Sequence, residues 1–360
     1  MGTPDLTSLT QIADYLDLQK AGLPWKFDAN DCQKDRGEVS GIVVDWGRQD
    51  LRVWALNESQ EVLFMKHSLD GSSTLSTDEY EPLLMKIIGR WLPPTVKQPL
   101  QIWISGTAGC KNGWQDAGYA KMPVRLDALP SRAVAVEVSD PRIEVHILPG
   151  LCQYSHHTPD VMRGEETLLL GLWDIEAIYS GLVLMPGEIN NKWIELHDGR
   201  AMLSRTHVTH ELFEAICQHT SLRQSVDVDV VDDQDGFEEG LKAARDTESA
   251  ALSNLYNIRA RSLLYDVSTA WSTAYLRGLL IGSEIREETC GINVDGAPHV
   301  HRSVTLLGSD VHAERYDRAL QYLGYAVKRV DADVARLRGL CFALNQNYCP
   351  IEQPDMVAFG

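Results

Sequence analysis

Two segments of this chain repeat one pattern, in which an apolar run ends at a glycine and a second apolar run follows a short polar turn. The first reads GIVVDWG and then LRVWALN from Gly41, and the second reads GLVLMPG and then NKWIEL from Gly181. β-Branched and aromatic runs on either side of a glycine-containing turn are typical of β-hairpins. The two hairpins predict two related lobes.

Helices and strands alternate after each hairpin. A helix is expected over 80–91, followed by the strand LQIWISG that ends at Gly106. Further helices are expected over 211–217, 252–264 and 271–284, ahead of a strand SVTLLGS. This alternation is typical of α/β domains.

The length of the chain indicates two domains. It has 360 residues, of which 44% are hydrophobic, and single cores stop growing near about 250–300 residues. We expect lobes over residues 39–178 and 179–345, between an N-terminal extension (1–38) and a C-terminal tail (346–360).

Charge and composition limit the partners. The net charge of -18, from 51 acidic and 33 basic residues, argues against nucleic acid, because like charges repel the phosphate backbone. The seven cysteines are scattered without a CxxC pair, which indicates reduced thiols. No stretch approaches the roughly 20 apolar residues of a membrane span, and no secretory leader opens the sequence. We expect a cytoplasmic protein without a membrane partner, and a homodimer stays open.

Two glycine turns are candidate phosphate sites. Asp45 ends an apolar strand beside Gly47, where its carboxylate could order magnesium while backbone amides of the turn face phosphates. The alternative is that Asp45 only caps the turn. Gly187 opens a similar turn, and Lys192 would add a point charge, although an ordinary hairpin is the alternative.

A third glycine precedes a helix. Gly308 ends the strand SVTLLGS, where an adenosine could lie against the backbone. Ser309 or Asp310 would follow at the start of the helix. Helix capping alone could explain both of these residues.

Arg163, Glu165 and Glu166 form the densest charged cluster next to an apolar helix. A buried carboxylate here could accept a proton from a substrate hydroxyl, and Arg163 could hold a substrate carboxylate in a two-pronged contact. Adjacent helix residues point about 100° apart, so the sequence does not decide which glutamate faces inward. The alternative is that both acids only favour the dipole at a helix N-terminus.

Eight blocks of sequence resemble, in the same order, the 2-dehydro-3-deoxygalactonokinase family. They extend from about residue 40 to about residue 342. The blocks are DWG at Asp45, GCKNGWQDAGY at Gly109, LPGL at Leu148, DVMRGEET at Asp160, LMPG and NKW from Leu184, THELF at Thr209, YNIRAR at Tyr256 and YLRGLLIGSEI at Tyr275.

The resemblance implies two actin-like (ribonuclease H-like) lobes with a central cleft. It implies ATP with Mg²⁺, and phosphorylation of the terminal hydroxyl of 2-dehydro-3-deoxy-D-galactonate in galactonate breakdown. It also implies that Lys111, Asn112 and Trp114 line the sugar-acid pocket, although Trp114 could equally be a core residue. The residues expected to bind the nucleotide are Gly47, Arg48, Gly187, Lys192, Gly308 and Ser309.

Three departures from the family pattern motivate an alternative function. Arg48 begins a turn in which the family has small hydroxyl residues, although an arginine could still hold phosphate. Glu188 follows Gly187 where the family has threonine, and a carboxylate within about 4 Å of a phosphate oxygen costs about 1 kcal/mol even in water. His210 replaces a glycine. The alternative is a catalytically impaired homologue that binds a sugar acid or nucleotide as a sensor or partner.

Overall fold

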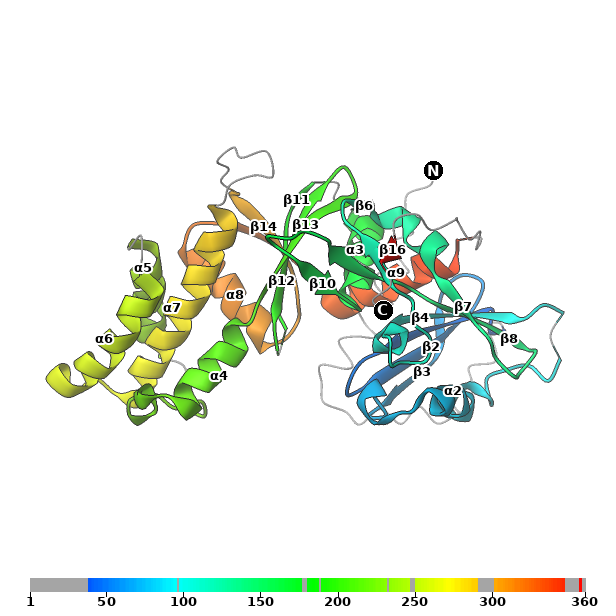
Figure 1. Cartoon of the computed structure of the whole chain (residues 1–360), viewed down its shortest axis with the longest axis horizontal. Coiled ribbons are helices and arrows are strands. Elements are labelled where there is room, and N and C mark those ends of the chain that lie inside the picture. The colour runs from blue at the N-terminus through cyan, green and yellow to red at the C-terminus, as the bar shows by residue number, and fades with distance from the viewer. Residues whose placement is uncertain are drawn as a thin grey trace. The chain divides into compact units, whose positions relative to one another are not determined.

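A computed structural model describes most of the chain after the N-terminal extension. The described residues are 38–95, 97–176, 180–187, 189–231, 233–246, 250–290, 301–346 and 356–357. They form two compact units (Figure 1), the first from residues up to 179, 197–203 and 331 onward, and the second from 180–196 and 204–330. The expected extension and most of the expected tail lie outside the described residues.

The first unit is built on a six-stranded sheet of order β3-β2-β1-β4-β8-β7. Its strands are β1 (Gly41–Trp46), β2 (Leu51–Leu56), β3 (Val62–Ser68), β4 (Leu100–Gly106), β7 (Val134–Val136) and β8 (Ile143–Ile147). β1 pairs antiparallel with β2 and parallel with β4, and β4 pairs parallel with β8. The pairing of Gly41 with Leu56 and of Trp46 with Leu51 confirms the first predicted hairpin.

Helices cover both faces of this sheet (Figure 1). They are α2 (Tyr80–Ile88), α3 (Glu165–Glu176) and α9 (Ala332–Leu344). Leu84 and Ile88 of α2 share a core with Ile42 and Val44 of β1, whereas α9 packs on α3, β1 and β4. A second sheet, β10-β9-β5-β16, consists of β5 (Tyr119–Lys121), β9 (Gly150–Gln153), β10 (Asp160–Met162) and β16 (Met356–Val357).

Glycines set the distance between α3 and α9. A Cβ atom added to Gly171 would lie 1.7 Å from the carbonyl oxygen of Ala335, and one added to Gly339 would lie 2.0 Å from the carbonyl oxygen of Thr167. Neither position leaves room for a methyl group. The two helices therefore touch backbone to backbone.

The second unit repeats the strand order of the first, as β13-β12-β11-β14-β15. Its strands are β11 (Gly181–Met185), β12 (Asn191–His197), β13 (Arg200–His207), β14 (Ser303–Leu307) and β15 (Ala326–Val330). β11 pairs antiparallel with β12 and parallel with β14, and β14 pairs parallel with β15. The start of β13 belongs to the first unit, where it pairs with β6 (Val124–Arg125). The second hairpin and the prediction of two related α/β lobes are confirmed.

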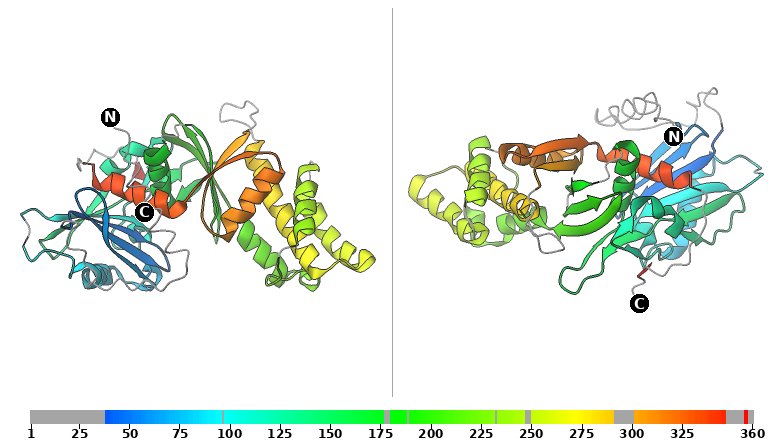
Figure 2. Two further views of the ribbon diagram at one scale, coloured as in Figure 1. Left: turned by 180° about the vertical axis from the view of Figure 1, so that it is seen from behind. Right: turned by 90° about the horizontal axis from the view of Figure 1, so that it is seen from above.

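The helices of the second unit gather around α7. They are α4 (Thr209–His219), α5 (Gln234–Asp246), α6 (Ala250–Tyr265), α7 (Thr269–Thr289) and α8 (Val311–Tyr322). α7 contacts the other four, and Figure 2 shows α5, α6 and α7 side by side in yellow-green and yellow. Sequence reasoning missed α5, although Phe237, Leu241 and Ala244 recur on its buried face at helical spacing. Among the described residues, no helix combines the length and apolar character that crossing a bilayer requires.

α9 belongs to the first unit, whereas the sequence analysis grouped residues 179–345 in one lobe. Its packing on α3, β1 and β4 is the reason. The chain therefore leaves the first unit after α3, returns to it briefly at residues 197–203, and ends in it with α9.

Gly171→Ala is expected to lower the free energy of unfolding by about 1–3 kcal/mol, because the new methyl group must push α3 away from the carbonyl of Ala335. Chemical denaturation measures this change. Ser253→Ala, at an exposed position of α6, is the control and should stay within about 0.5 kcal/mol of the parent chain. Equal stability of the Gly171→Ala variant and the parent would contradict the close backbone contact.

Candidate active site

Asp45 lies near the carboxyl end of β1, opposite Ser105 of β4. Side chains alternate along a strand, and the neighbours Val44 and Trp46 both pack in the core with α2. Asp45 therefore points to the opposite face, where its Oδ2 lies 2.9 Å from Nε of Arg336 in α9. The side chain of Asp45 is 14% exposed. Its carboxylate is thus held by an ion pair rather than by the capping contact that was the alternative.

The turn after β1 is fixed through its carbonyl groups. The carbonyl of Gly47 accepts a 3.0 Å hydrogen bond from the amide of Ser72, and that of Arg48 accepts one of 3.0 Å from the amide of Ser73. A Cβ atom added to Gly47 would lie 2.6 Å from Oδ1 and 3.1 Å from the carbonyl oxygen of Asp50, so the turn packs closely on Asp50. Arg48 is exposed. Both Gly47 and Arg48 therefore lie in the turn directly after β1.

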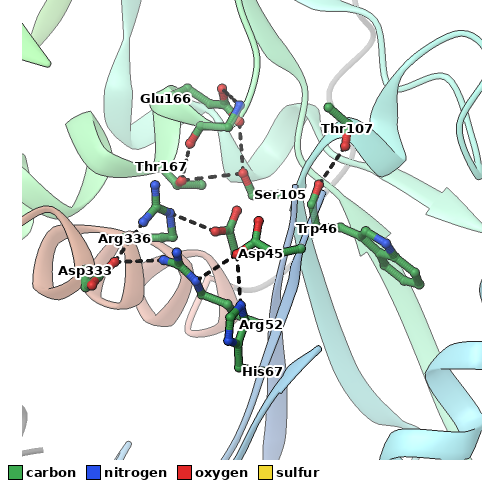
Figure 3. Close-up of polar contacts among 12 residues, drawn as sticks. Asp45, Trp46, Arg52, His67, Ser105, Thr107, Glu166, Thr167, Asp333 and Arg336 are labelled. Atoms are coloured by element: carbon green, nitrogen blue, oxygen red, sulfur yellow. Dashed lines mark hydrogen bonds and ion pairs between the residues drawn. The ribbon is translucent and has the colours of Figure 1, made fainter. Parts of the chain in front are cut away.

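Two hydroxyl groups that sequence reasoning missed lie beside this turn. Oγ of Ser72 and Oγ1 of Thr107 are 2.6 Å apart, and Thr107 donates a 2.9 Å hydrogen bond to the carbonyl of Trp46 (Figure 3). Gly106 makes this approach possible: its φ is 97°, and an added Cβ atom would lie 2.4 Å from the carbonyl oxygen of Trp46. The family pattern has hydroxyl residues within the turn, but here they come from other segments, so no local motif reveals them.

Glu166 is the buried acid of the charged cluster. Its side chain is 1% exposed. Oε1 accepts a 3.1 Å hydrogen bond from the Ser105 hydroxyl, and Oε2 accepts one of 2.6 Å from the Gly164 amide (Figure 3). Burial, and next the charge of Glu165, raise the pKa of Glu166 to about 7. This carboxyl group can therefore exchange a proton near neutral pH.

Glu165 occupies a different environment at the start of α3. Its Oε2 accepts a 3.0 Å hydrogen bond from the amide of Arg163, and its side chain is only partly buried. Both acids thus accept backbone amides at a helix N-terminus, as the structural alternative expects. Their burial separates them, because only Glu166 is almost completely withdrawn from water.

Arg163 packs across the loop that follows β4. Its Nη2 donates a 2.7 Å hydrogen bond to the carbonyl of Gly118, and its guanidinium lies 4.2 Å from the ring centroid of Tyr119. Nε and Nη1 are buried and have no hydrogen-bond partner among the described residues. Buried donors without an acceptor are costly, and a guanidinium can satisfy two donors with one carboxylate.

The loop that holds Lys111, Asn112 and Trp114 divides between surface and core. Lys111 and Asn112 are exposed. Trp114 is buried. Its ring stacks on that of Tyr80, with 5.9 Å between the ring centroids, and meets the ring of Trp46 edge-on, with 6.1 Å between the centroids. Trp114 therefore lies in the core of the first unit, which was one of its two interpretations.

In the second unit, two candidate glycines meet at the carboxyl ends of β11 and β14. The Gly187 amide donates a 3.2 Å hydrogen bond to Oδ1 of Asn191. A Cβ atom added to Gly308 would lie 2.6 Å from Cβ of Ala313 and 3.7 Å from Cδ of Pro186. Gly308 thus lies against both α8 and the turn after β11. Open α/β sheets bind ligands at this edge.

The other nucleotide candidates of this unit have structural contacts. Oδ1 of Asp310, rather than Ser309, accepts a 2.9 Å hydrogen bond from an amide in the first turn of α8. Lys192 is buried in β12, and its Nζ donates a 2.6 Å hydrogen bond to Oγ1 of Thr206. Glu188 lies outside the described residues.

A basic pocket lies where α4, α7 and α8 meet. Arg277, Arg315, His210 and His312 line it, and its internal space is about 20 Å³, room for about one water molecule. Burial, and next the charge of Arg315, lower the pKa of Arg277 to about 10. Two arginines therefore lie close together around this small space. No local motif marks this pocket, so sequence reasoning found only His210.

Glu284 of α7 connects the basic pocket to the turn after β11. Its buried carboxylate accepts hydrogen bonds of 2.6 Å from Trp193, 2.5 Å from Tyr316 and 3.1 Å from Nδ2 of Asn191. Oδ1 of Asn191 in turn accepts a hydrogen bond from the amide of Gly187. One side chain therefore ties the glycine turn to two helices of the second unit.

Glu166→Gln is expected to remove part of the pH dependence of stability. The folded-state pKa of Glu166 is raised from 4.5 to about 7, so its contribution is complete below about pH 4.5 and is lost as the pH rises through about 7. This shift corresponds to about 3 kcal/mol. Between about pH 4 and pH 8, the free energy of unfolding of the variant should therefore gain about 3 kcal/mol relative to the parent. Urea denaturation at each pH measures the free energy of unfolding. The control is Glu58→Gln, a substitution at an exposed position. If the free energies of unfolding of Glu166→Gln and the parent change in parallel with pH, the raised pKa of Glu166 is refuted.

Comparison with known proteins identifies the family of this chain. The 2-keto-3-deoxy-galactonokinase family matches residues 45–343. A Rhizobium meliloti (strain 1021) protein named as a 2-dehydro-3-deoxygalactonokinase, DgoK1, is 36% identical over 303 residues, which cover 83% of this chain and 95% of the relative. The 2-dehydro-3-deoxygalactonokinase of Escherichia coli (strain K12) is 27% identical over 299 residues, with the same coverage of 83% and 95%. The crystal structure of a 2-dehydro-3-deoxygalactonokinase protein from Sinorhizobium meliloti has a TM-score of 0.74 and 35% identity, covering 84% of this chain and 97% of that chain. The chain therefore belongs to the 2-keto-3-deoxy-galactonokinase family.

Proposed function

We propose that this chain is an ATP-dependent kinase that transfers the γ-phosphoryl group to the terminal hydroxyl of 2-dehydro-3-deoxy-D-galactonate. Family membership and the 36% identical relative named for this activity support the reaction and the substrate. The observation that carries the proposal is structural. Each unit gathers its candidate ligand residues at the carboxyl ends of its central parallel strands, around Asp45 in the first and Gly187 and Gly308 in the second.

In this proposal Glu166 is the general base. A base works best when its pKa lies near the working pH, and burial raises the pKa of Glu166 to about 7. The Gly164 amide holds Oε2, which leaves Oε1 directed at the Ser105 hydroxyl. The substrate hydroxyl would replace the Ser105 hydroxyl at Oε1 and give up its proton there.

Arg163 would bind the carboxylate of the sugar acid. Its buried Nε and Nη1 have no acceptor among the described residues, and the contact with Tyr119 holds the guanidinium plane in place. A carboxylate would satisfy both donors at once. The exposed side chains of Lys111 and Asn112 would add polar contacts from the neighbouring loop.

Asp45 fits a magnesium ion that arrives with ATP. Among the described residues no group of three or more His, Cys, Asp and Glu side chains could hold a metal. Mg²⁺ usually keeps several waters and binds through one or two carboxylates together with substrate phosphates, so a single carboxylate is sufficient. When bound, the ion neutralises charge on the phosphates during transfer.

The glycine turns would hold the nucleotide. Gly47 and Gly187 allow backbone amides to approach phosphates, and Arg48 is exposed beside the first turn. Gly308 and Ser309, at the start of α8, would contact the adenosine. The buried Lys192, whose ammonium group donates to Thr206, would add its positive charge.

The direct test is an assay of ATP consumption with 2-dehydro-3-deoxy-D-galactonate and other keto-deoxy sugar acids. We expect turnover with the galactonate compound. Asp45→Asn should lower kcat by at least about 100-fold, because the variant loses the charge that orders the metal. Its circular dichroism spectrum should match that of the parent chain. Absence of turnover with every sugar acid tested would contradict the proposed function.

Arg163→Met is expected to raise KM for the sugar acid by about 10- to 100-fold, because a hydrogen bond to a charged group contributes about 1.5–3 kcal/mol. KM for ATP should stay within about twofold, since Arg163 is assigned no nucleotide contact. Arg142→Met removes another arginine, one paired with Asp140 at the surface of the first unit, and should leave both constants unchanged. A rise in KM for ATP alone would remove Arg163 from the sugar-acid site.

A further inference from the structure

Arg336 lies between two aspartates at the edge of the six-stranded sheet. Its Nε is 2.9 Å from Oδ2 of Asp45, and its Nη1 donates a 3.1 Å hydrogen bond to Oδ1 of Asp333. Asp333 and Arg336 are one turn apart on α9, so the helix presents both toward β1. The candidate metal-ordering carboxylate therefore already has a cation beside it.

A second arginine, Arg52, belongs to the same network: it lies opposite Asp45 in the pairing of β1 with β2, but its ion pairs are with Asp333 and Asp50. Nη1 of Arg52 donates a 2.8 Å hydrogen bond to the same oxygen of Asp333, and its Nε lies 3.3 Å from Asp50 (Figure 3). His67 lies 3.2 Å from the same Asp50 oxygen. Arg52 thus provides a matched comparison for Arg336 within one set of charges.

The environment of Asp45 makes a counter-ion necessary. With 14% of its side chain exposed, water solvates the carboxylate poorly, and an unpaired charge there would be unstable. An arginine guanidinium carries its positive charge throughout the physiological pH range, so Arg336 supplies the counter-ion at 2.9 Å.

We propose that Arg336 is the resident counter-ion of Asp45 and competes with Mg²⁺ for this carboxylate. The inference rests on the proposed function, in which Asp45 orders the metal. A divalent ion that approaches Asp45 meets the positive charge of Arg336, which weakens its binding. The same charge attracts the phosphates of a nucleotide without metal. Both effects reduce the gain in affinity that Mg²⁺ gives to nucleotide binding, so Arg336 is a positioning residue that sets the metal requirement.

The test is the Mg²⁺ gain, defined as the Kd of ADP without Mg²⁺ divided by the Kd with saturating Mg²⁺, measured by isothermal titration calorimetry. Arg336→Gln should raise the gain by about tenfold, the factor that corresponds to about 1.4 kcal/mol. Arg336→Lys keeps the charge and should stay within about threefold of the parent. In the background of Asp45→Asn, Arg336→Gln should have no further effect, because the shared carboxylate charge is gone.

Arg52→Gln is the matched control, since it removes a cation of the same network whose ion pairs are with Asp333 and Asp50, whereas that of Arg336 is with Asp45 itself. Its Mg²⁺ gain should stay within about twofold of the parent. An unchanged or lower gain in Arg336→Gln, or an equal rise in Arg52→Gln, would overturn the proposal. Thermal unfolding of each variant shows that the comparison is made between folded chains.

A measurement without nucleotide separates this inference from the kinase function. Titration with Mn²⁺ alone, followed by electron paramagnetic resonance, should show tighter Mn²⁺ binding in Arg336→Gln than in the parent. The double variant Asp45→Asn with Arg336→Gln should lose that difference. If the parent fails to bind ADP with or without Mg²⁺, the kinase function is contradicted. The Mn²⁺ titration still decides whether Arg336 and metal compete, and equal Mn²⁺ binding by the parent and Arg336→Gln would refute the competition.

Discussion

The parallel pairing of β1 with β4 is the constraint on which the candidate site depends. It sets Asp45 opposite Ser105, and the alternation of side chains turns both away from α2. Ser105 then meets Glu166 at the start of α3, while Asp45 meets Arg336 of α9. Two helices from distant parts of the sequence therefore act on neighbouring residues of adjacent strands. A shift of β1 along β4 by one residue would point Asp45 into the apolar core.

The two units share a strand order but differ in the charged side chains of their candidate sites. In the first unit the edge holds the carboxyl groups of Asp45 and Glu166. In the second, the pocket near the glycine turn is lined by Arg277 and Arg315. This difference suits the proposed chemistry, because metal ordering and proton removal require carboxylates, whereas a phosphate-bearing nucleotide requires positive charge. The hairpin and the parallel strands are common to both units, and the helices that follow determine the electrostatics.

Local patterns were sufficient for some parts of the site and insufficient for others. The two hairpins and the positions of Gly187 and Gly308 could be predicted, because apolar strands that end at glycine are visible within a few residues. The choice between Glu165 and Glu166 could not be made, since it depends on how α3 packs against β4. Arg336 was missed because nothing in its own neighbourhood links it to Asp45.

Trp114 and α9 also differ from the predictions made from sequence, and in both cases the cause is tertiary packing. Trp114 follows a glycine-rich stretch that resembles a binding loop, yet the loop folds back through hydrogen bonds to the carbonyl of Ala108, which turns the indole into the core. α9 follows the second unit directly in sequence, but its glycine contact with α3 draws it to the first. Both outcomes depend on tertiary packing, and neither has a signature in a short window of sequence.

The return of α9 to the first unit also affects how the protein is made. A ribosome synthesises β1 and β4 early, then the whole second unit, and only afterwards Arg336. Until that moment the nascent first unit lacks the helix that packs on β1 and β4, and Asp45 lacks its partner. The N-terminal half of the chain is therefore an unfinished domain for most of translation, with apolar surface of the kind that chaperones bind.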